Sequence, residues 1–189
     1  MVKSVLLVGV GGQGTILAAK LLTTGLMEAG YDVKMSEIHG MSQRGGSVSS
    51  QVRYGEKVES PVIEIGGADI LVAFEKMEAL RWINYLKPEG KVIVNDFKIY
   101  SMPIRSGKFE YPKGIVNELS GKVQTIAVDA EKYAAELGNR KVMNIILLGT
   151  IIKTMNLEGI NWDQIIADNV KEQFVDINRQ ALALGMSLA

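Results

Sequence analysis

Cysteine is absent from the 189-residue sequence, and histidine occurs once. Without cysteine the chain can form no disulfide, offers no thiolate nucleophile and cannot ligate an iron–sulfur cluster or a cysteine-type zinc site. The absence of cysteine also fits a reducing compartment. We therefore expect a cytoplasmic protein whose own side chains carry no redox centre.

An excess of charge of either sign is also missing, because 21 basic residues balance 21 acidic ones. The charges are scattered, so no basic stripe predicts a nucleic-acid or anionic-membrane partner. Long apolar runs are lacking too, and the first one, "SVLLVGV", is short and ends in glycines. It predicts a β-strand rather than a signal peptide or a membrane span.

The first half of the sequence predicts alternating strands and helices. A strand over residues 4–10 leads into a glycine turn, and a helix over 15–30 ends at Gly30. A strand over 31–38 completes a βαβ unit, and residues 46–66 predict two antiparallel strands attached to the parallel core. A buried strand from Asp69 to Glu75 then precedes a helix that ends near Pro88 and Gly90.

The second half continues the pattern and ends in helices. We expect a strand over 91–96, a hairpin-like segment over 97–112, a strand over 122–130 and a helix capped by Asp129 or Ala130. From residue 141 onward, apolar residues recur at three-to-four spacing, which predicts helices to the end. The fold class is therefore α/β: one three-layer α/β/α Rossmann-like domain over residues 1–189, with a mostly parallel sheet, an inserted antiparallel strand pair and C-terminal helices.

The turn after the first strand contains a G-x-G-x-x-G pattern, formed by Gly9, Gly11 and Gly14. Glycine allows a tight turn and lets a pyrophosphate approach backbone N–H groups at a helix N-terminus. Glu37 lies 23 residues after Gly14, where dinucleotide folds place the acid that binds the ribose. The pattern alone indicates an NAD(P)-binding dehydrogenase or reductase.

Other features argue against that interpretation. Gly12 and Gln13 place an amide side chain beside the expected anion site, and a dense polar loop follows Glu37 directly. The alternative is that the glycines only allow the strand and the helix to pack closely. The sequence leaves both possibilities open.

The loop "SEIHGMSQRGGSV" over residues 36–48 is not explained by a generic fold. His39 can titrate near neutral pH, but a structural histidine is the simpler interpretation because no partner nucleophile or second metal ligand is evident. Arg44 precedes two glycines, so its guanidinium can reach a carboxylate or phosphate with two hydrogen bonds; the alternative is a surface arginine. Met41 and Gln43 are typical of interfaces and also of gap-filling positions.

Four separated segments carry a resemblance to a known family. They are "VLLVGVGGQG", "SEIHGMSQRGGSVSSQVRYG", "PVIEIGGADILVAFE" and "NIILLG", which together extend over nearly the whole chain. In this order they resemble the gamma-type domain of 2-oxoacid:ferredoxin oxidoreductases, most closely the free-standing small subunits of the indolepyruvate branch.

The resemblance implies an activity shared with a partner. The complex would oxidatively decarboxylate aryl pyruvates to aryl-acetyl-CoA with ferredoxin as the electron acceptor. Thiamine diphosphate, Mg²⁺, [4Fe–4S] clusters and coenzyme A would be used through the alpha subunit, and this chain alone would bind no cofactor. Such chemistry needs a carbanion-stabilising cofactor and one-electron acceptors, which these side chains do not supply. A third possibility is an assembly module that never approaches the substrate.

The resemblance also implies two groups of site residues. The glycine turn, a possible phosphate or coenzyme A contact, comprises Gly9, Gly11, Gly12, Gln13 and Gly14. The loop, expected at the subunit interface or near the substrate, comprises Glu37, His39, Gly40, Met41, Gln43, Arg44, Gly45 and Gly46. No residue is assigned as catalytic, and His39 is the only candidate. Glu75 ends the "LVAFE" strand, where open α/β sheets place groups that face ligands.

Overall fold

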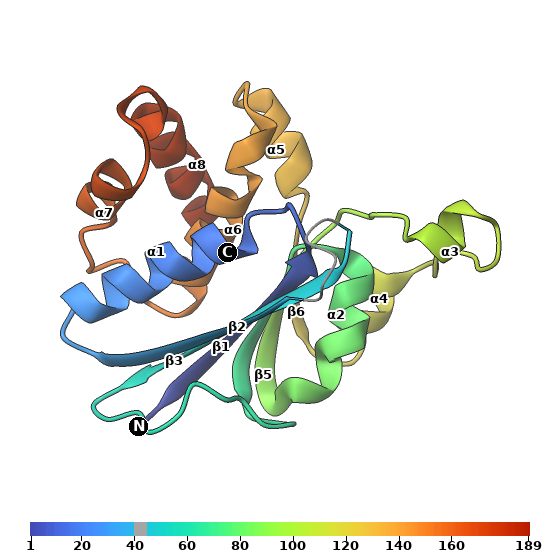
Figure 1. Cartoon of the computed structure of the whole chain (residues 1–189), viewed down its shortest axis with the longest axis horizontal. Helices are drawn as coiled ribbons and strands as arrows, with labels where there is room; N and C mark the ends of the chain where they lie inside the picture. The colour runs from blue at the N-terminus through green and yellow to red at the C-terminus, as the bar shows by residue number, and fades with distance from the viewer. Residues whose placement is uncertain (40–44) are drawn as a thin grey trace.

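The computed structural model describes residues 1–39 and 45–189. Six strands form one sheet in the order β2-β3-β1-β4-β5-β6 (Figure 1). Their bounds are β1 Lys3–Val10, β2 Asp32–His39, β3 Ser47–Gly55, β4 Ala68–Ala73, β5 Leu86–Asn95 and β6 Gln124–Val128. Strands β1, β4, β5 and β6 are parallel, which confirms the α/β class and the mostly parallel sheet.

The antiparallel part of the sheet differs from the expected strand pair. Strand β3 is antiparallel to β1 on one side and to β2 on the other. Strand β2 therefore runs in the direction of β1, as in a βαβ unit, but β3 separates the two. The position of β3 follows from tertiary pairing, which the sequence pattern does not encode.

The second strand of the expected pair does not form. Residues 56–67, here called the strap, cross the sheet and are held by side chains instead of a ladder. The amide oxygen of Gln51 accepts from Ile63 N at 2.6 Å, and Arg53 Nη1 donates to the carbonyls of Ser60 and Val62. Pro61 offers no N–H for a ladder, which is consistent with this outcome.

Helices cover both faces of the sheet, as expected for three layers (Figure 1). One hydrophobic cluster joins one sheet face to α1, α5, α6, α7 and α8, and a second joins the other face to α2 and α4. The helices are α1 Thr15–Glu28, α2 Lys76–Trp82, α3 Met102–Arg105, α4 Ile115–Ser120, α5 Ala130–Glu136, α6 Met143–Thr154, α7 Trp162–Asn169 and α8 Val175–Ser187. Short 3₁₀ turns occupy Ile83–Tyr85 (η1), Arg140–Val142 (η2) and Glu172–Phe174 (η3). None of the described helices is long and apolar enough to cross a bilayer.

Two glycines let the C-terminal helices approach closely. A Cβ on Gly149 of α6 would lie 2.3 Å from the carbonyl oxygen of Leu182, and one on Gly185 of α8 would lie 2.0 Å from that of Ile146. Backbone contact at this distance is possible only without side chains at the crossing. The glycine of the "NIILLG" motif therefore serves helix packing.

Several predicted boundaries are confirmed and others are wrong. Gly30 ends α1 in the left-handed conformation, with Tyr31 N bonded to Leu26 O, and Asp129 caps α5. The helix expected to reach Pro88 ends at Trp82, because β5 already begins at Leu86. The expected hairpin over 97–112 is wrong as well. That segment contains the short helix α3, and Pro103 in its first turn is compatible with a helix start but not with a ladder.

Candidate functional site

The glycine turn joins the end of β1 to the start of α1 at the carboxyl edge of the sheet. Gly12 and Gly14 have φ values of +105° and +80°, which side chains other than glycine rarely adopt. Gly14 is the N-cap of α1 without a side-chain cap, and the first turn of α1 holds no acidic residue. The positive end of the helix is therefore not neutralised by the first turn itself.

The amide group of Gln13 is not free to bind an anion, although the sequence places it beside the expected anion site. Its Oε1 accepts from Val10 N at 2.8 Å, and its Nε2 donates to the carbonyl of Phe74 at 2.8 Å. Both ends of the amide are therefore used inside the protein. The side chain locks the turn against the carboxyl end of β4.

Two asparagines extend this network. Asn95, fully buried at the end of β5, donates through Nδ2 to the same Phe74 carbonyl at 3.1 Å and accepts from Ala130 N at 3.0 Å. Asn144, on α6, donates through Nδ2 to the carbonyl of Gly14 at 3.3 Å. The carboxyl ends of β1, β4 and β5 and the starts of α1, α5 and α6 are thus joined by side-chain amides. Sequence reasoning missed both residues, although Asn144 is a polar residue inside an apolar helix, which is a usable signal.

The far end of the polar loop closes over the glycine turn. Gly11 N donates to the carbonyl of Gly46 at 2.9 Å, and Gly45 N donates to that of Gly11 at 3.4 Å. Ser47 then hydrogen-bonds Glu78 of α2. The structure therefore brings together the two predicted site segments at this point. Gly40, Met41, Gln43 and Arg44 lie outside the described residues.

His39 and Glu37 stand at the end of β2, on the edge of the sheet. His39 is exposed, which argues against a structural histidine, and Glu37 is half-buried. Because β3 lies between β1 and β2, Glu37 is two strand spacings from β1, roughly 10 Å. A dinucleotide fold places its ribose-binding acid on the strand next to β1. The strand order and the use of Gly11 N by Gly46 therefore argue against an NAD(P) site.

Two cavities flank the glycine turn. One, of about 430 Å³, lies between the start of α1, the end of β2 and the start of β3, and is lined by Gly11, Gly12, Gly14, Thr15, Ile16, His39 and Val48. The other, of about 450 Å³, is lined by Gly12, Gln13, Gly14, Phe97, Glu131, Arg140, Lys141 and Met143. Gly12 and Gly14 border both. The described residues contain no group of three or more His, Cys, Asp or Glu side chains that could hold a metal ion.

The sequence suggests that Glu75 faces a ligand, but the structure places its carboxylate inside the protein. Glu75 is 1% exposed and caps α2 by accepting from Glu78 N at 3.1 Å. Its other oxygen accepts from Ile99 N at 3.1 Å and from the hydroxyl of Tyr111. Glu75 therefore fixes the segment that follows β5.

Comparison with known proteins places this geometry in a family. The sequence matches the family described as pyruvate ferredoxin/flavodoxin oxidoreductase over residues 4–188. It is 40% identical to the indolepyruvate oxidoreductase subunit IorB of Pyrococcus horikoshii, covering 98% of this chain and 95% of that protein. A similar fold occurs in the pyruvate oxidoreductase subunit PORC of Thermotoga maritima (TM-score 0.75, 20% identity, covering 98% and 96% of the two chains).

A second solved structure with this fold is the 2-oxoglutarate:ferredoxin oxidoreductase of Magnetococcus marinus, with a TM-score of 0.77 and 18% identity. The match covers all of this chain and 31% of that longer one. In that protein the fold is one part of a larger polypeptide. Given the full-length match and the 40% identity, this chain belongs to the pyruvate ferredoxin/flavodoxin oxidoreductase family.

Proposed function

We propose that the chain is the small subunit of an indolepyruvate:ferredoxin oxidoreductase. The complex converts aryl pyruvates to aryl-acetyl-CoA and passes the electrons to ferredoxin. The observation that carries this proposal is the 40% identity to an indolepyruvate oxidoreductase subunit over 98% of the chain. We assign the subunit to the cytoplasm, in keeping with its lack of cysteine.

The cofactors of this reaction belong to the large (alpha) subunit. A chain without cysteine cannot supply thiolates to [4Fe–4S] clusters. When bound to the large subunit, these groups supply carbanion stabilisation and one-electron transfer. The small subunit contributes shape and contacts at the site.

Within the small subunit, the glycine turn contacts a phosphate of coenzyme A. Gly12 and Gly14 border both cavities, and α1 presents its positive end to them without an acidic side chain in its first turn. Gly11 is less suited to this role, because its N–H already donates to Gly46 O. We also assign His39, at the end of β2, to the side of the subunit that meets the large subunit near the substrate.

Reconstitution with the large subunit tests the assignment. Indolepyruvate-dependent and coenzyme A-dependent reduction of ferredoxin should require both subunits, and pyruvate should be a poorer substrate. Absence of indolepyruvate turnover in a complex that holds its thiamine diphosphate and clusters would refute the proposal. A dehydrogenase activity of this chain alone with NAD(P)H would favour the other class of enzyme.

A glycine pair tests the coenzyme A contact. Gly12→Ala adds a Cβ at the border of both cavities, whereas Gly30→Ala adds one at the far end of α1, and both positions have positive φ with no atom within 4 Å of the new Cβ. The two changes should therefore cost similar stability, about 1 kcal/mol. Only Gly12→Ala should raise the KM for coenzyme A, by about tenfold or more. An equal KM in both variants would exclude the turn from the coenzyme A site.

A further inference from the structure

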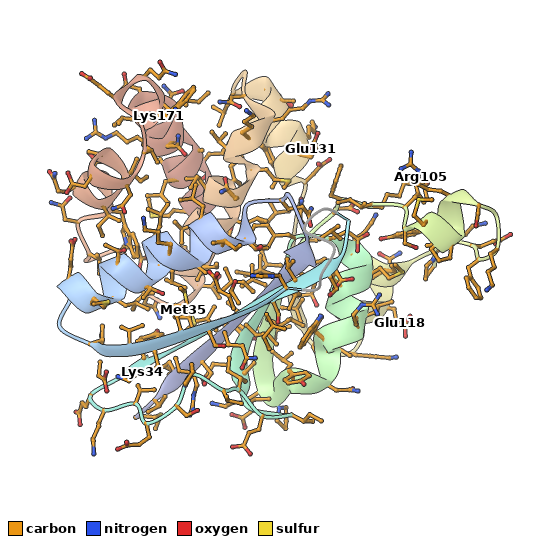
Figure 2. All side chains as sticks on the ribbon, in the orientation of Figure 1. Lys34, Met35, Arg105, Glu118, Glu131 and Lys171 are labelled. Carbon is orange, nitrogen blue, oxygen red and sulfur yellow. The ribbon has the colours of Figure 1, made fainter. Side chains whose placement is uncertain are left out.

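The segment after β5 projects from the body of the protein. It comprises residues 97–114, here called the arm, and contains α3 (Figure 1). Figure 2 shows Arg105 on this arm, well away from Lys34 and Met35, which lie on the outer strand β2. The arm leaves the carboxyl edge of the sheet, the edge that also carries the glycine turn. It is therefore continuous with the surface around the proposed site.

Large apolar side chains of the arm face the solvent. Met102 is 73% exposed, Phe109 60% and Tyr100 46%. Single exposed apolar residues are common, but three within ten residues of one projecting segment are typical of an interaction surface. Methionine and aromatic residues are also the types that protein interfaces favour.

The arm concentrates positive charge in a chain that is neutral overall. It carries Lys98, Arg105, Lys108 and Lys113 against a single acid, Glu110. In the described part of the chain, none of these four basic groups forms an ion pair within 4 Å. A partner that meets the arm therefore has carboxylates at the edge of its contact area.

The base of the arm is fixed rather than loose. Glu75 accepts from Ile99 N and from the Tyr111 hydroxyl, so one buried carboxylate holds both ends of the arm. Lys76 N donates to the carbonyl of Phe97 at 3.0 Å, and the rings of Tyr100 and Tyr111 meet edge to face at 5.7 Å. A surface ordered before binding loses less conformational entropy on association, which favours affinity.

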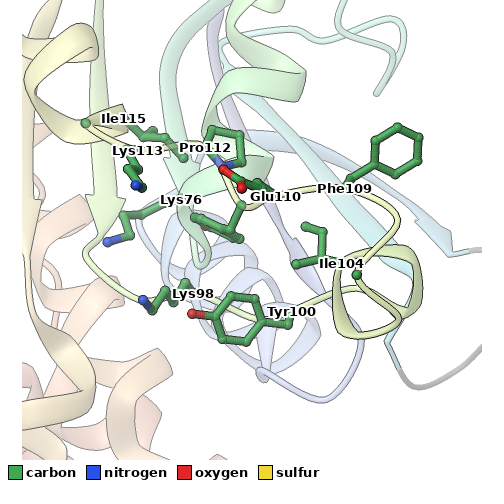
Figure 3. Close-up of a pocket in the computed structure, with 12 residues that line it drawn as sticks. Lys76, Lys98, Tyr100, Ile104, Phe109, Glu110, Pro112, Lys113 and Ile115 are labelled. Carbon is green, nitrogen blue, oxygen red and sulfur yellow. The ribbon is translucent and has the colours of Figure 1, made fainter.

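A cavity of about 700 Å³ is lined mainly by residues of the arm, with Lys76 and Ile115 at its border with the body. Lys76, Lys98 and Lys113 point to the same side of it, and Glu110, Tyr100 and Ile104 also line it, while the ring of Phe109 points away from it (Figure 3). The exposed Met102 and Phe109, together with the excess of basic side chains, suit a partner surface that has apolar residues and neighbouring acids. We propose that the arm is a docking element for the large subunit. The matching surface of the large subunit is expected to be a recess with apolar residues at its centre and carboxylates around them.

This inference rests on the proposed function, and two observations favour the large subunit as the occupant. The arm shares the carboxyl edge of the sheet with the proposed site, and in the Magnetococcus protein the same fold is joined to the remainder of a longer chain. The competing occupant is a second copy of this chain. Its strap carries Glu56, Glu59 and Glu64 beside the exposed Val62 and Ile65, but the strap begins at the opposite edge of the sheet.

The test measures binding of the small subunit to the complete large subunit by calorimetry. The variant Met102→Ser with Phe109→Ser should weaken binding at least tenfold, since truncated interface anchors commonly cost this much or more. Met27→Ser, at a position that is 60% exposed on α1, is the matched control and should change affinity less than twofold. Thermal unfolding of both variants should stay close to wild type, because the altered side chains are exposed.

A charge variant adds a second measurement. Arg105→Glu with Lys108→Glu should lower the association rate about tenfold at low salt, and the difference should shrink as salt rises. Lys20→Glu with Lys171→Glu, at two exposed positions outside the arm, makes the same change in net charge and should have a smaller effect.

The outcomes separate the inference from the proposed function. If the wild-type subunits assemble and turn over indolepyruvate while the Met102 and Phe109 variant binds equally well, the arm is not the docking element. If wild-type subunits neither assemble nor react, both proposals fail together. If the isolated subunit is a dimer that the arm variant dissociates, with unchanged affinity for the large subunit, a second copy occupies the arm and the inference is overturned.

Discussion

The glycine turn after β1 and the arm after β5 leave the same edge of the sheet but are built in opposite ways. The turn directs its polar side chain inward, where the amide of Gln13 bonds Val10 and Phe74. The arm directs apolar side chains outward and is fixed by one buried carboxylate, Glu75. A turn that must hold backbone N–H groups in place needs internal partners. A projecting segment that presents side chains to solvent needs internal contacts only where it joins the body of the protein.

The energetic consequences differ accordingly. A change in the turn disturbs several strand ends at once, because Phe74 O is shared by Gln13 and Asn95. A change at the tip of the arm disturbs almost nothing inside the chain. Mutations that disturb the internal contacts of Gln13 or Gly14 should therefore act first on stability, and mutations at the tip of the arm first on assembly.

The largest expected change in stability comes from comparing alanine substitutions at two glycines that share the same backbone conformation. Gly14 and Gly114 are N-caps with φ values of +80° and +72°, but a Cβ on Gly14 would lie 2.6 Å from Asn144 Nδ2, whereas one on Gly114 meets no atom within 4 Å. Gly14→Ala should lower the free energy of unfolding by about 2–5 kcal/mol, from strain plus overpacking. Gly114→Ala should lower it by about 1 kcal/mol. Equal losses in urea denaturation would show that the turn is no more tightly packed than the base of the arm.

The next effect concerns the amide that locks the turn. Gln13→Leu leaves Val10 N without its acceptor and should cost about 2–4 kcal/mol in unfolding free energy. Gln13→Glu keeps that acceptor but places a carboxylate against the Phe74 carbonyl. Protonation restores a donor, so this variant should gain stability relative to wild type when the pH falls from 7 to 4. If the stability of Gln13→Glu relative to wild type does not depend on pH, the side chain does not bond Phe74.

These two cases show what the sequence could and could not predict. The turn itself follows from the glycine spacing between an apolar run and a helical pattern. The inward direction of Gln13 does not, because its partner Phe74 is 61 residues away and comes into reach only through the β1–β4 pairing.

The same limit applies to the sheet and to the arm. Alternating polarity predicts β2 and β3 as strands, but their order depends on which edges meet in three dimensions. Residues 97–112 contain Pro103, Gly107 and Pro112, which are compatible with the turns of a hairpin and also with the irregular backbone of the arm. The sequence predicts a strand that ends at Glu75, whereas β4 ends at Ala73 and Glu75 is the N-cap of α2. The role of Glu75 depends on Ile99 and Tyr111, which the sequence does not place beside it.

The base of the arm should respond to high pH, whereas the turn should not, because its bonds use amides that do not titrate. Burial, followed by the hydrogen bond to Glu75, raises the pKa of Tyr111 above its usual value of 10.0. A raised folded-state pKa means that the contribution of Tyr111 is fully present below pH 10 and is lost as the pH rises further. Wild type should therefore lose more stability than Tyr111→Phe between pH 9 and pH 11.

The comparison with Tyr111→Phe is needed because another tyrosine titrates late. Burial, helped by Tyr31 and Asp69, raises the pKa of Tyr54 to about 12, and Tyr54 is present in both proteins. The difference between the two denaturation curves therefore isolates Tyr111. Identical curves would mean that the Glu75–Tyr111 contact does not hold the arm.

The smallest expected effect on stability belongs to His39, which stands where the turn meets the polar loop. Its side chain is exposed at the end of an edge strand, so His39→Ala should change the unfolding free energy by no more than about 0.5 kcal/mol. A larger loss would indicate that His39 is a structural histidine after all.

The role of His39 in the reaction is tested by measuring turnover of the reconstituted complex as a function of pH. If His39 carries a proton in the reaction, His39→Ala and His39→Gln should both shift the pH profile of kcat while assembly stays unchanged. If His39 only lines the cavity beside Gly12, His39→Ala should raise the KM for coenzyme A, and His39→Gln should return it to the wild-type value. The pH profile should then stay as in wild type for both variants, because glutamine replaces the contact without carrying a proton.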